Sequence, residues 1–377
     1  MYEPSAFCRE LERLGSDFYV GVPDTVIENF CNYIHENPPP GGQVIAANEG
    51  GAVGMAAGRY LATGKIPVVY MQNSGIGNAV NPLLSLADRD VFAIPMLLLV
   101  GWRGEPGVKD EPQHVKQGRV SQDLFDSLEI PCGIIGHGWN ETVAELERAY
   151  AAMRRQPGPY ALLVRNGCFA PYERVRAGYA DAGMKREDAI RVIIENVDAR
   201  TAFVASTGMG PRELYELREA LGQPHERDFL NAGAMGHASM IAAGAAMAQP
   251  GRTVVCLDGD GALYMHLGAL ALLPTLPCPN LVHILLNNGV HDSVGGQPNL
   301  GQTAEASSLA RAAGYRTVLE AWNAETLAKA LGECGKKDGP VFLEVKIARG
   351  FRKDLGRPGI PFPEAGRQFR EFLAARD

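Results

Sequence analysis

The sequence predicts an α/β protein with two doubly wound, mainly parallel-sheet domains. Short apolar runs alternate with helix-like stretches through both halves of the chain, which is the pattern of parallel strands covered by helices on both faces. The chain has 377 residues, enough for two domains of ordinary size, and a polar, weakly structured stretch occupies 166–186. We therefore expect one domain at 1–168, a linker at 169–185 and a second domain at 186–377.

Each half repeats the same order of elements. In the first half we expect strands at 17–22, 43–47, 66–71, 95–100 and 160–165, helices at 4–15, 25–36, 49–63 and 141–156, and an irregular loop at 101–119. In the second half we expect strands at 201–206, 253–257, 281–286 and 341–346, and helices at 186–197, 211–221, 236–248, 305–313 and 324–332. The basic tail 349–357 is interpreted as a surface arm before a last short helix.

Composition and charge exclude several classes of protein. The formal net charge of −7 argues against a general binder of nucleic acid or anionic membranes. The seven cysteines are scattered without zinc spacing, which indicates reduced thiols in a cytosolic protein. The N-terminal stretch has no apolar signal core, and no apolar run is long enough to span a membrane. We expect a cytoplasmic protein that acts on a small molecule, with no nucleic-acid or membrane partner.

Two neighbouring strands of the second half are followed by oxygen ligands. Asp260 comes shortly after the run 253–257, and Asn287-Asn288 follows the run 281–286. A right-handed crossover brings such strand ends side by side at the carboxyl edge of the sheet. Carboxylate and amide oxygens suit Mg²⁺, and glycines flanking the aspartate leave room for a phosphate group. Either segment alone would more commonly be a plain turn, but the two together indicate a site.

Gly259-Asp260-Gly261 followed by Asn287-Asn288 resembles the cofactor motif of thiamine diphosphate-dependent enzymes. The resemblance implies that Asp260, Asn288 and the carbonyl of Val290 hold Mg²⁺ against the cofactor diphosphate. Only one of the two asparagines is expected to be a ligand, because neighbours on a strand face opposite ways. The other cofactor-binding positions implied are Thr207, Gly208, Gly233 (a carbonyl to the pyrimidine), Met235 (an amide and an apolar wedge), Gly236, His237, Gly259, Gly261 and Ala262.

Glu49 is the first candidate catalytic residue. It begins a stretch rich in glycine and alanine, which permits close approach of a flat ligand. A carboxylate in the first turn of a helix is commonly only a partner of the helix dipole. The segment also resembles the one that, in the decarboxylases of this family, supplies a glutamate to the aminopyrimidine. Apolar neighbours would raise the pKa of Glu49 and suit it to share a proton there.

Asp24 and the loop 101–119 complete the candidate site. Asp24 is interpreted either as a helix cap or, by the resemblance, as an active-site acid. The loop carries Arg103, Lys109 and His114 in an acidic protein. Such a loop is usually just solvated, but arginine and lysine together suit a phosphonate or carboxylate, and histidine could relay a proton. A glycine-rich turn at 73–78 could line the same pocket.

Within the family, this short two-domain chain resembles the decarboxylases of 3-phosphonopyruvate. The segments GVPDT, ANEGGAVGMAAG, WRGEPGVKDEPQHVKQG and LLNNGVHDSVGGQPN carry the resemblance. It implies release of CO₂ and 2-phosphonoacetaldehyde in phosphonate biosynthesis, with Glu49 activating the cofactor and Asp24 or His114 handling the later protonation. It also implies a homodimer or larger assembly with active sites between chains. The fusion of both halves in one chain favours the phosphonate substrate over sulfopyruvate.

Three rival interpretations remain. The chain could decarboxylate sulfopyruvate or another 2-oxoacid, or act as a carboligase. A regulatory paralogue that only binds cofactor would be expected to lack Glu49, which is present. A nucleotide-binding oxidoreductase would carry a strand-linked GxGxxG motif, which this sequence does not have.

Overall fold

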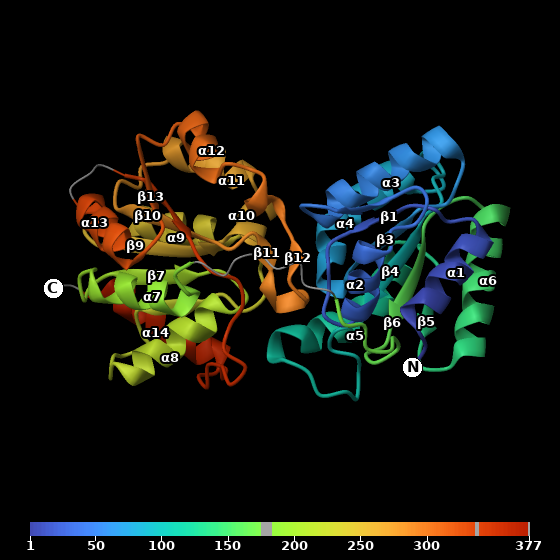
Figure 1. Cartoon of the computed structure of the whole chain (residues 1–377), viewed down its shortest axis with the longest axis horizontal. Helices are drawn as coiled ribbons and strands as arrows, with labels where there is room; N and C mark the ends of the chain where they lie inside the picture. The colour runs from blue at the N-terminus through green and yellow to red at the C-terminus, as the bar shows by residue number, and fades with distance from the viewer. Residues whose placement is uncertain (175–182, 336–338, 376–377) are drawn as a thin grey trace. The chain divides into compact units, whose positions relative to one another are not determined.

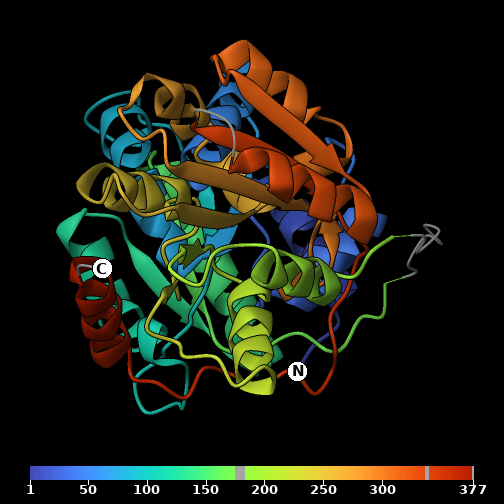
Figure 2. The same cartoon turned by 90° about the vertical axis from the view of Figure 1, so that its left-hand side faces the viewer.

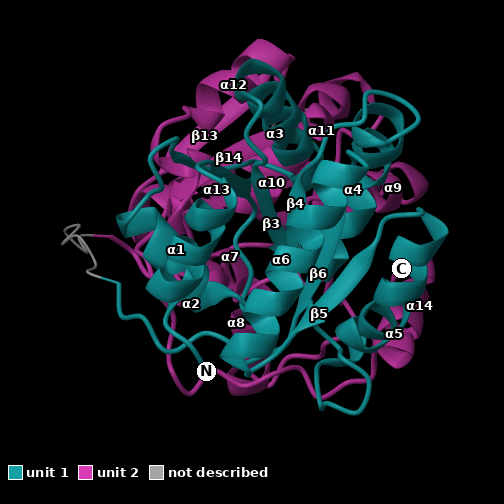
Figure 3. Ribbon diagram, turned by 90° about the vertical axis from the view of Figure 1, so that its right-hand side faces the viewer, with its two compact units in different colours: residues 1–178 teal, residues 179–377 magenta. Residues whose placement is uncertain are grey.

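The computed structural model describes residues 1–174, 183–335 and 339–375. They fall into two compact units, residues 1–178 and 179–377 (Figures 1 and 3). Residues 175–182, which belong to the expected linker, lie outside the described residues. Each unit is built on one six-stranded parallel sheet with helices on both faces, so the expected fold class is confirmed. Among the described residues, no helix is both long and apolar enough to cross a bilayer.

The sheet of the first unit has the strand order β2-β1-β3-β4-β6-β5. Side chains that alternate along its strands enter two apolar clusters, one packed under α1, α2 and α6 and the other under α3, α4 and α5. The strands are β1 (Tyr19–Gly21), β2 (Gln43–Ile45), β3 (Val68–Gln72), β4 (Leu97–Gly101), β5 (Cys132–Ile135) and β6 (Tyr160–Val164). The helices are α1 (Pro4–Leu14), α2 (Glu28–Glu36), α3 (Glu49–Thr63), α4 (Ile76–Pro82), α5 (Pro112–Ser127) and α6 (Trp139–Arg155).

The sheet of the second unit has the order β13-β14-β10-β9-β7-β8. Figure 2 shows the strands and helices of this unit from another direction. Its strands are β7 (Ala202–Ala205), β8 (Asp228–Leu230), β9 (Val254–Gly259), β10 (Leu281–Asn287), β13 (Thr317–Ala321) and β14 (Val341–Lys346), with a small antiparallel pair, β11 (Val290–His291) and β12 (Gln297–Pro298). Its helices are α7 (Arg186–Glu195), α8 (Gly210–Ala220), α9 (Ala238–Ala248), α10 (Asp260–Met265), α11 (Gly268–Leu272), α12 (Ala306–Ala313), α13 (Ala324–Cys334) and α14 (Phe362–Ala374).

The prediction of an irregular loop at 101–119 is wrong for the second half of that segment. Helix α5 begins at Pro112, a residue suited to a first helical turn, so His114 lies on a helix. Gly118 lies inside this helix, where the chain packs closely. A Cβ on Gly118 would come within 1.7 Å of the carbonyl oxygen of Gly104. The indole of Trp102 also donates to the Gly118 carbonyl at 2.9 Å.

Three strands of the two main sheets were not predicted, namely β5, β8 and β13, and neither was the two-residue pair β11 and β12. The strands β5, β8 and β13 contain only four, three and five residues, and most of their side chains are partly exposed. In β8 the first residue is Asp228, which is buried because both its oxygens accept from Arg218 at 2.9 Å. A strand that begins with a paired charge lacks the apolar run by which the other strands were found.

Candidate active site

Asp260 lies at the junction of β9 and α10, beside the end of β10. The two strands are parallel neighbours, with Gly259 opposite Leu286. The Oδ1 atom of Asp260 accepts from the Gly261 N–H at 2.7 Å and from Asn299 Nδ2 at 2.9 Å, and its Oδ2 atom accepts from the N–H groups of Asn288 at 3.1 Å and Gly289 at 2.5 Å. All four donors are neutral. Burial raises the pKa of Asp260 to about 6, although these hydrogen bonds act in the opposite direction.

The adjacent asparagines Asn287 and Asn288 contact different residues. Asn287 donates to Glu344 Oε1 at 2.8 Å and accepts from the Gly289 N–H at 3.1 Å. Asn288 donates through Nδ2 to Asp292 at 2.7 Å, and its Oδ1 accepts from the Val290 N–H at 3.1 Å. Asn288, unlike Asn287, lines a cavity together with Asp260 and Val290. The structure thus brings together the three residues expected to bind a metal.

This cavity contains most of the positions expected to bind the cofactor. Its wall includes Thr207, Gly208, Met235, Gly259, Asp260, Gly261, Ala262, Asn288 and Val290. The 11-residue helix α8 begins at Gly210, also in the wall, so N–H groups at its start can contribute to anion binding. Gly208 has φ +111°, a backbone conformation open mainly to glycine. A buried carboxylate whose four hydrogen-bond donors among the described residues are neutral, beside amide and carbonyl oxygens, fits a divalent cation and the diphosphate it would hold.

Gly233, Gly236 and His237 are not part of that wall. The Met235 N–H donates to the Gly233 carbonyl at 3.0 Å, so contact of this N–H with a pyrimidine requires the turn to open. Gly236 packs on His266, where a Cβ would come within 2.4 Å of Cδ2. The His237 ring lies 4.5 Å from the His266 ring, edge to face.

Several residues at this cavity were not predicted from the sequence. His291 packs on Gly261, where a Cβ would lie 2.8 Å from the imidazole Cε1, and burial lowers the pKa of His291 to about 4. Asn299 reaches Asp260 from 39 positions away. Arg186, at the start of α7, lines the cavity and pairs with Asp292. The sequence signal for His291 was its position directly after Val290, whereas Arg186 is too distant in the chain for any local motif to indicate it.

In the first unit, Glu49 is buried at the start of α3. Its Oε2 atom accepts from Asn78 Nδ2 at 2.8 Å. Gly75 lies against the carboxyl group, and a Cβ there would come within 2.3 Å of Oε1. Burial raises the pKa of Glu49, and the hydrogen bond from Asn78 only partly offsets this. The glycine-rich segment 73–78, whose last three residues begin α4, therefore accommodates and holds Glu49.

Asp24 is completely buried after β1. Its Oδ2 accepts from the Val26 N–H at 3.0 Å, whereas its Oδ1 has no hydrogen-bond partner within the described part of the chain. Burial raises the pKa of Asp24 to about 6, against the influence of Arg103. Gly101 makes room for it, since a Cβ would lie 1.8 Å from Oδ2. Helix α2 begins only at Glu28, so Asp24 is not its N-cap.

The cationic loop is partly neutralised by its own acid. Arg103 donates from Nε and Nη2 to the two oxygens of Asp110 at 2.8 and 2.5 Å, and from Nη1 to Thr25 at 2.9 Å. Lys109, next to Asp110, is exposed, and His114 is half-buried on α5.

The basic tail lies against α7 and α8. Arg352 pairs with Glu187 at 3.0 Å and also with Glu216. Arg212 of α8 donates to the Gly356 carbonyl at 2.6 Å. The expected surface arm is therefore attached to its own unit by ion pairs, and Gly350 at its start reaches Asp292 in the wall of the cavity.

Comparison with known proteins gives consistent matches over both units. Residues 5–127 match the family model described as thiamine pyrophosphate enzyme, N-terminal TPP binding domain, and residues 215–345 match the corresponding C-terminal TPP binding domain. A phosphonopyruvate decarboxylase from Streptomyces hygroscopicus is 34% identical over 99% of this chain and 94% of its own length. Another from Streptomyces viridochromogenes is also 34% identical, over 96% and 93%. A sulfopyruvate decarboxylase from Methanosarcina acetivorans is 27% identical over 96% and 95%.

Proposed function

Because the chain belongs to the thiamine diphosphate-dependent decarboxylases of the phosphonopyruvate and sulfopyruvate type, we propose that its substrate is 3-phosphonopyruvate. The products would be CO₂ and 2-phosphonoacetaldehyde, in phosphonate biosynthesis, including that of antibiotics. The observation that carries this choice is the 34% identity, over nearly the whole chain, to phosphonopyruvate decarboxylases, against 27% to the sulfopyruvate enzyme. In the reaction the bond to the carboxylate breaks, its electron pair remains on the former keto carbon, and a proton replaces CO₂ there.

In this proposal the second unit holds the cofactor diphosphate through Mg²⁺. Asp260, Asn288 and the Val290 carbonyl would be the protein ligands, and Thr207 and Gly208 would approach the diphosphate. When bound, thiamine diphosphate supplies the electron sink for the pair left by CO₂. The buried position of Asp260 supports this assignment, because a cation would compensate a carboxylate that burial disfavours in its charged form.

Glu49 and Asp24 would move protons. Glu49, fixed by Asn78, would share a proton with the aminopyrimidine, and its raised pKa suits exchange with a weakly basic nitrogen. Asp24 would deliver the proton that replaces CO₂, through the Oδ1 atom that has no partner among the described residues. His114 is the second candidate for that step.

Arg103 and Lys109 would bind the phosphonate group. A guanidinium has five N–H donors, and the three described contacts of Arg103 leave two for a ligand. The exposed ammonium of Lys109 would supply a second positive charge. A pyruvate lacking the phosphonate would leave these cations without their partner, which is a basis for selectivity.

We also propose that the chain self-associates, as a homodimer or larger assembly with active sites between chains. In the first unit, Met55 and Leu61 on α3 and Phe92 are exposed apolar side chains. In the second, Met247 on α9 and Leu272 on α11 are similarly exposed. An apolar patch on the surface marks a protein interface, and these side chains are the ones that we expect such an interface to cover. Sedimentation velocity measures this directly, and a monomer with full activity would contradict it.

Sulfopyruvate is the second candidate substrate. The fused arrangement of the two halves does not discriminate against it, because the match to the Methanosarcina enzyme also covers 95% of that protein in one chain. The test is to compare kcat/KM for 3-phosphonopyruvate, sulfopyruvate and pyruvate, with and without added thiamine diphosphate and Mg²⁺. We expect the highest value for 3-phosphonopyruvate and dependence on both additions. A higher value for sulfopyruvate would favour the second candidate.

A further inference from the structure

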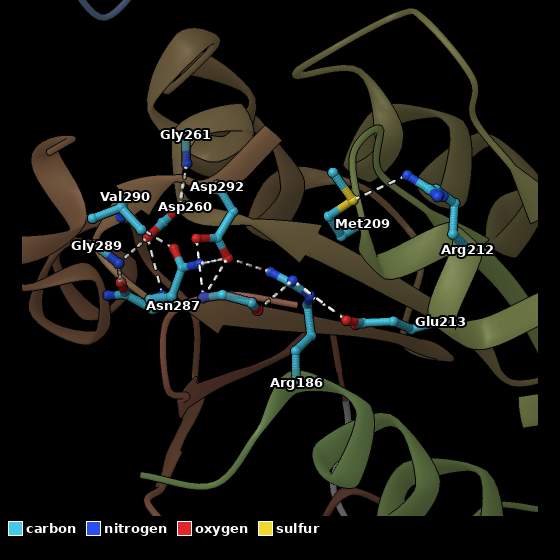
Figure 4. Close-up of polar contacts among 12 residues, drawn as sticks. Arg186, Met209, Arg212, Glu213, Asp260, Gly261, Asn287, Gly289, Val290 and Asp292 are labelled. Carbon is cyan, nitrogen blue, oxygen red and sulfur yellow. Dashed lines mark hydrogen bonds and ion pairs between the residues drawn. The ribbon is translucent and has the colours of Figure 1, made fainter. Parts of the chain in front are cut away.

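The side chain of Asp292 connects the candidate cation site to the rest of the second unit. Its Oδ2 atom accepts from Asn288 Nδ2 at 2.7 Å and from Arg186 Nη1 at 3.1 Å. Both its oxygens lie 3.1 Å from the Gly350 N–H. Asp292 is thus held by Asn288, four positions away, and by Arg186 and Gly350, which are 106 and 58 positions away. Figure 4 shows Arg186 beside Asp292.

These contacts determine which end of the Asn288 amide faces the cavity. An ionised carboxylate only accepts hydrogen bonds, so the NH₂ group of Asn288 must face Asp292. The amide oxygen then points the other way, toward the Val290 N–H, where it accepts at 3.1 Å. An amide turned by 180° would place two oxygens against each other and direct NH₂ toward a cation, and both contacts are repulsive.

Arg186 in turn holds Asp292. Its Nε donates to Glu213 at 2.8 Å, its Nη1 donates to Asp292, and its Nη2 donates to the Gly350 carbonyl at 3.1 Å. The side chains of Arg186 and Glu213 are only 9% and 3% exposed, so this network is shielded from solvent. The guanidinium of Arg186 therefore fixes the Asp292 carboxylate, which orients Asn288. It also connects the start of α7 and the start of the tail to Asp292.

We propose that Asp292 is a positioning residue for the cation site, and that Arg186 acts through it. Asp292 would present Asn288 Oδ1 as a ligand without itself binding the cation. The inference rests on the proposed function, because it assumes that Asn288 is a ligand. Replacing a residue that orients a metal ligand commonly changes the metal affinity, although that residue does not touch the metal.

A purely structural role for the network predicts a different result from the same variants. Glu213 and Asp292 are both acidic partners of Arg186, but only Asp292 contacts Asn288. Glu213→Gln is therefore a matched control for the loss of an ion pair. If the network only joined α7, α8 and the tail, Asp292→Ala and Glu213→Gln would both lower the thermal stability, and both would leave the cation affinity unchanged.

The experiment is a Mn²⁺ titration of the full chain at saturating thiamine diphosphate, with free Mn²⁺ followed by electron paramagnetic resonance. We expect Asp292→Ala to weaken Mn²⁺ binding roughly 10- to 100-fold. Glu213→Gln should lower the unfolding temperature of the cation-free protein but retain wild-type Mn²⁺ affinity. Asp292→Asn keeps the volume and replaces the alanine variant if that does not fold. Asp292→Asn should also weaken Mn²⁺ binding, because an amide at position 292 both donates and accepts and so no longer dictates the orientation of Asn288.

Two results would overturn the inference alone. One is wild-type Mn²⁺ affinity in the folded Asp292 variant, and the other is an equal loss of affinity in Glu213→Gln. Asp260→Ala provides the reference for a lost ligand. Failure of the wild-type protein to bind Mn²⁺ together with thiamine diphosphate would instead refute the proposed cation site, so the two failures are distinguishable.

Discussion

Asp24 in the first unit and Asp260 in the second are both buried, and burial raises the pKa of each to about 6, yet their surroundings differ. Asp260 accepts four N–H hydrogen bonds, which occupy both its oxygens and hold its carboxylate in one orientation. Asp24 has one oxygen without a partner among the described residues. The first arrangement suits a fixed ligand, and the second suits a group that gives up or takes a proton. A similar pKa is therefore compatible with two different roles, and the hydrogen bonds distinguish them.

The comparison extends to Glu49, whose replacement should have the largest effect. Glu49→Gln removes the proton that the carboxyl group shares but keeps the shape that fits beside Gly75. We expect kcat to fall about 10²- to 10⁴-fold, the usual contribution of a general acid–base group. Isothermal titration with thiamine diphosphate and Mg²⁺ should still show binding. Unchanged turnover would remove Glu49 from the mechanism.

The cation site of the second unit is tested by replacing each of two neighbouring asparagines separately. Asn288→Ala should weaken Mn²⁺ binding at least about 10-fold, because it removes a proposed ligand. Asn287→Ala should leave that affinity nearly intact and instead lower the free energy of unfolding by about 1–3 kcal/mol, because Glu344 loses a buried donor. Chemical denaturation and the Mn²⁺ titration measure the two quantities separately. The reverse pattern would assign the ligand to Asn287.

Asp24→Asn tests the other side of the comparison by pH. Burial raises the pKa of Asp24 from 3.8 to about 6 in the folded chain, so the folded state binds a proton that the unfolded state has released. Its contribution to stability is therefore fully present below about pH 4 and is lost as the pH rises through 6. At neutral pH the loss amounts to roughly 3 kcal/mol at most, so the cofactor-free variant should be more stable than wild type at pH 7 and similar to it at pH 4.

The same change should lower activity. If Asp24 delivers the proton that replaces CO₂, the wild-type kcat declines above about pH 6 as the acid ionises. In Asp24→Asn we expect kcat to be about 10²-fold lower, and the decline of kcat above about pH 6 to disappear. Equal stability of the two proteins at pH 7, or an unchanged pH profile of kcat, would contradict the assignment.

The two units also differ in what the sequence could predict. The βαβ unit that carries Asp260 was predictable because β9 and β10 are buried parallel strands, which appear as continuous apolar runs. The local context of Glu49 was predictable from its glycine-rich helix. The contacts that fix these residues were not, because Asn78, Asn299 and Arg186 lie 29, 39 and 106 positions from Glu49, Asp260 and Asp292. Local periodicity contains no information on such pairs, which only the packed sheets bring together.

Asn78 shows how one of these unpredicted contacts is tested. Asn78→Ala removes the hydrogen bond to Glu49 Oε2 and leaves the carboxyl group buried, so the pKa of Glu49 should rise further. We expect kcat to fall about 10-fold, less than for loss of the acid itself. The acidic limb of the kcat profile should move to higher pH. Asn78→Asp would instead place a second carboxyl group beside the first, and a smaller loss with aspartate than with alanine would contradict this explanation.

The smallest effect is expected for Arg103→Lys, which concerns substrate rather than cofactor. Lysine keeps the positive charge but lacks the planar fork that binds both oxygens of Asp110. With the fork lost, we expect KM for 3-phosphonopyruvate to rise about 3- to 10-fold, equivalent to roughly 1 kcal/mol, while kcat changes little. Pyruvate, which has no phosphonate, serves as the internal control and should show no change in kcat/KM. An equal loss for both substrates would mean that Arg103 only holds the loop, and that the phosphonate is bound by other cations.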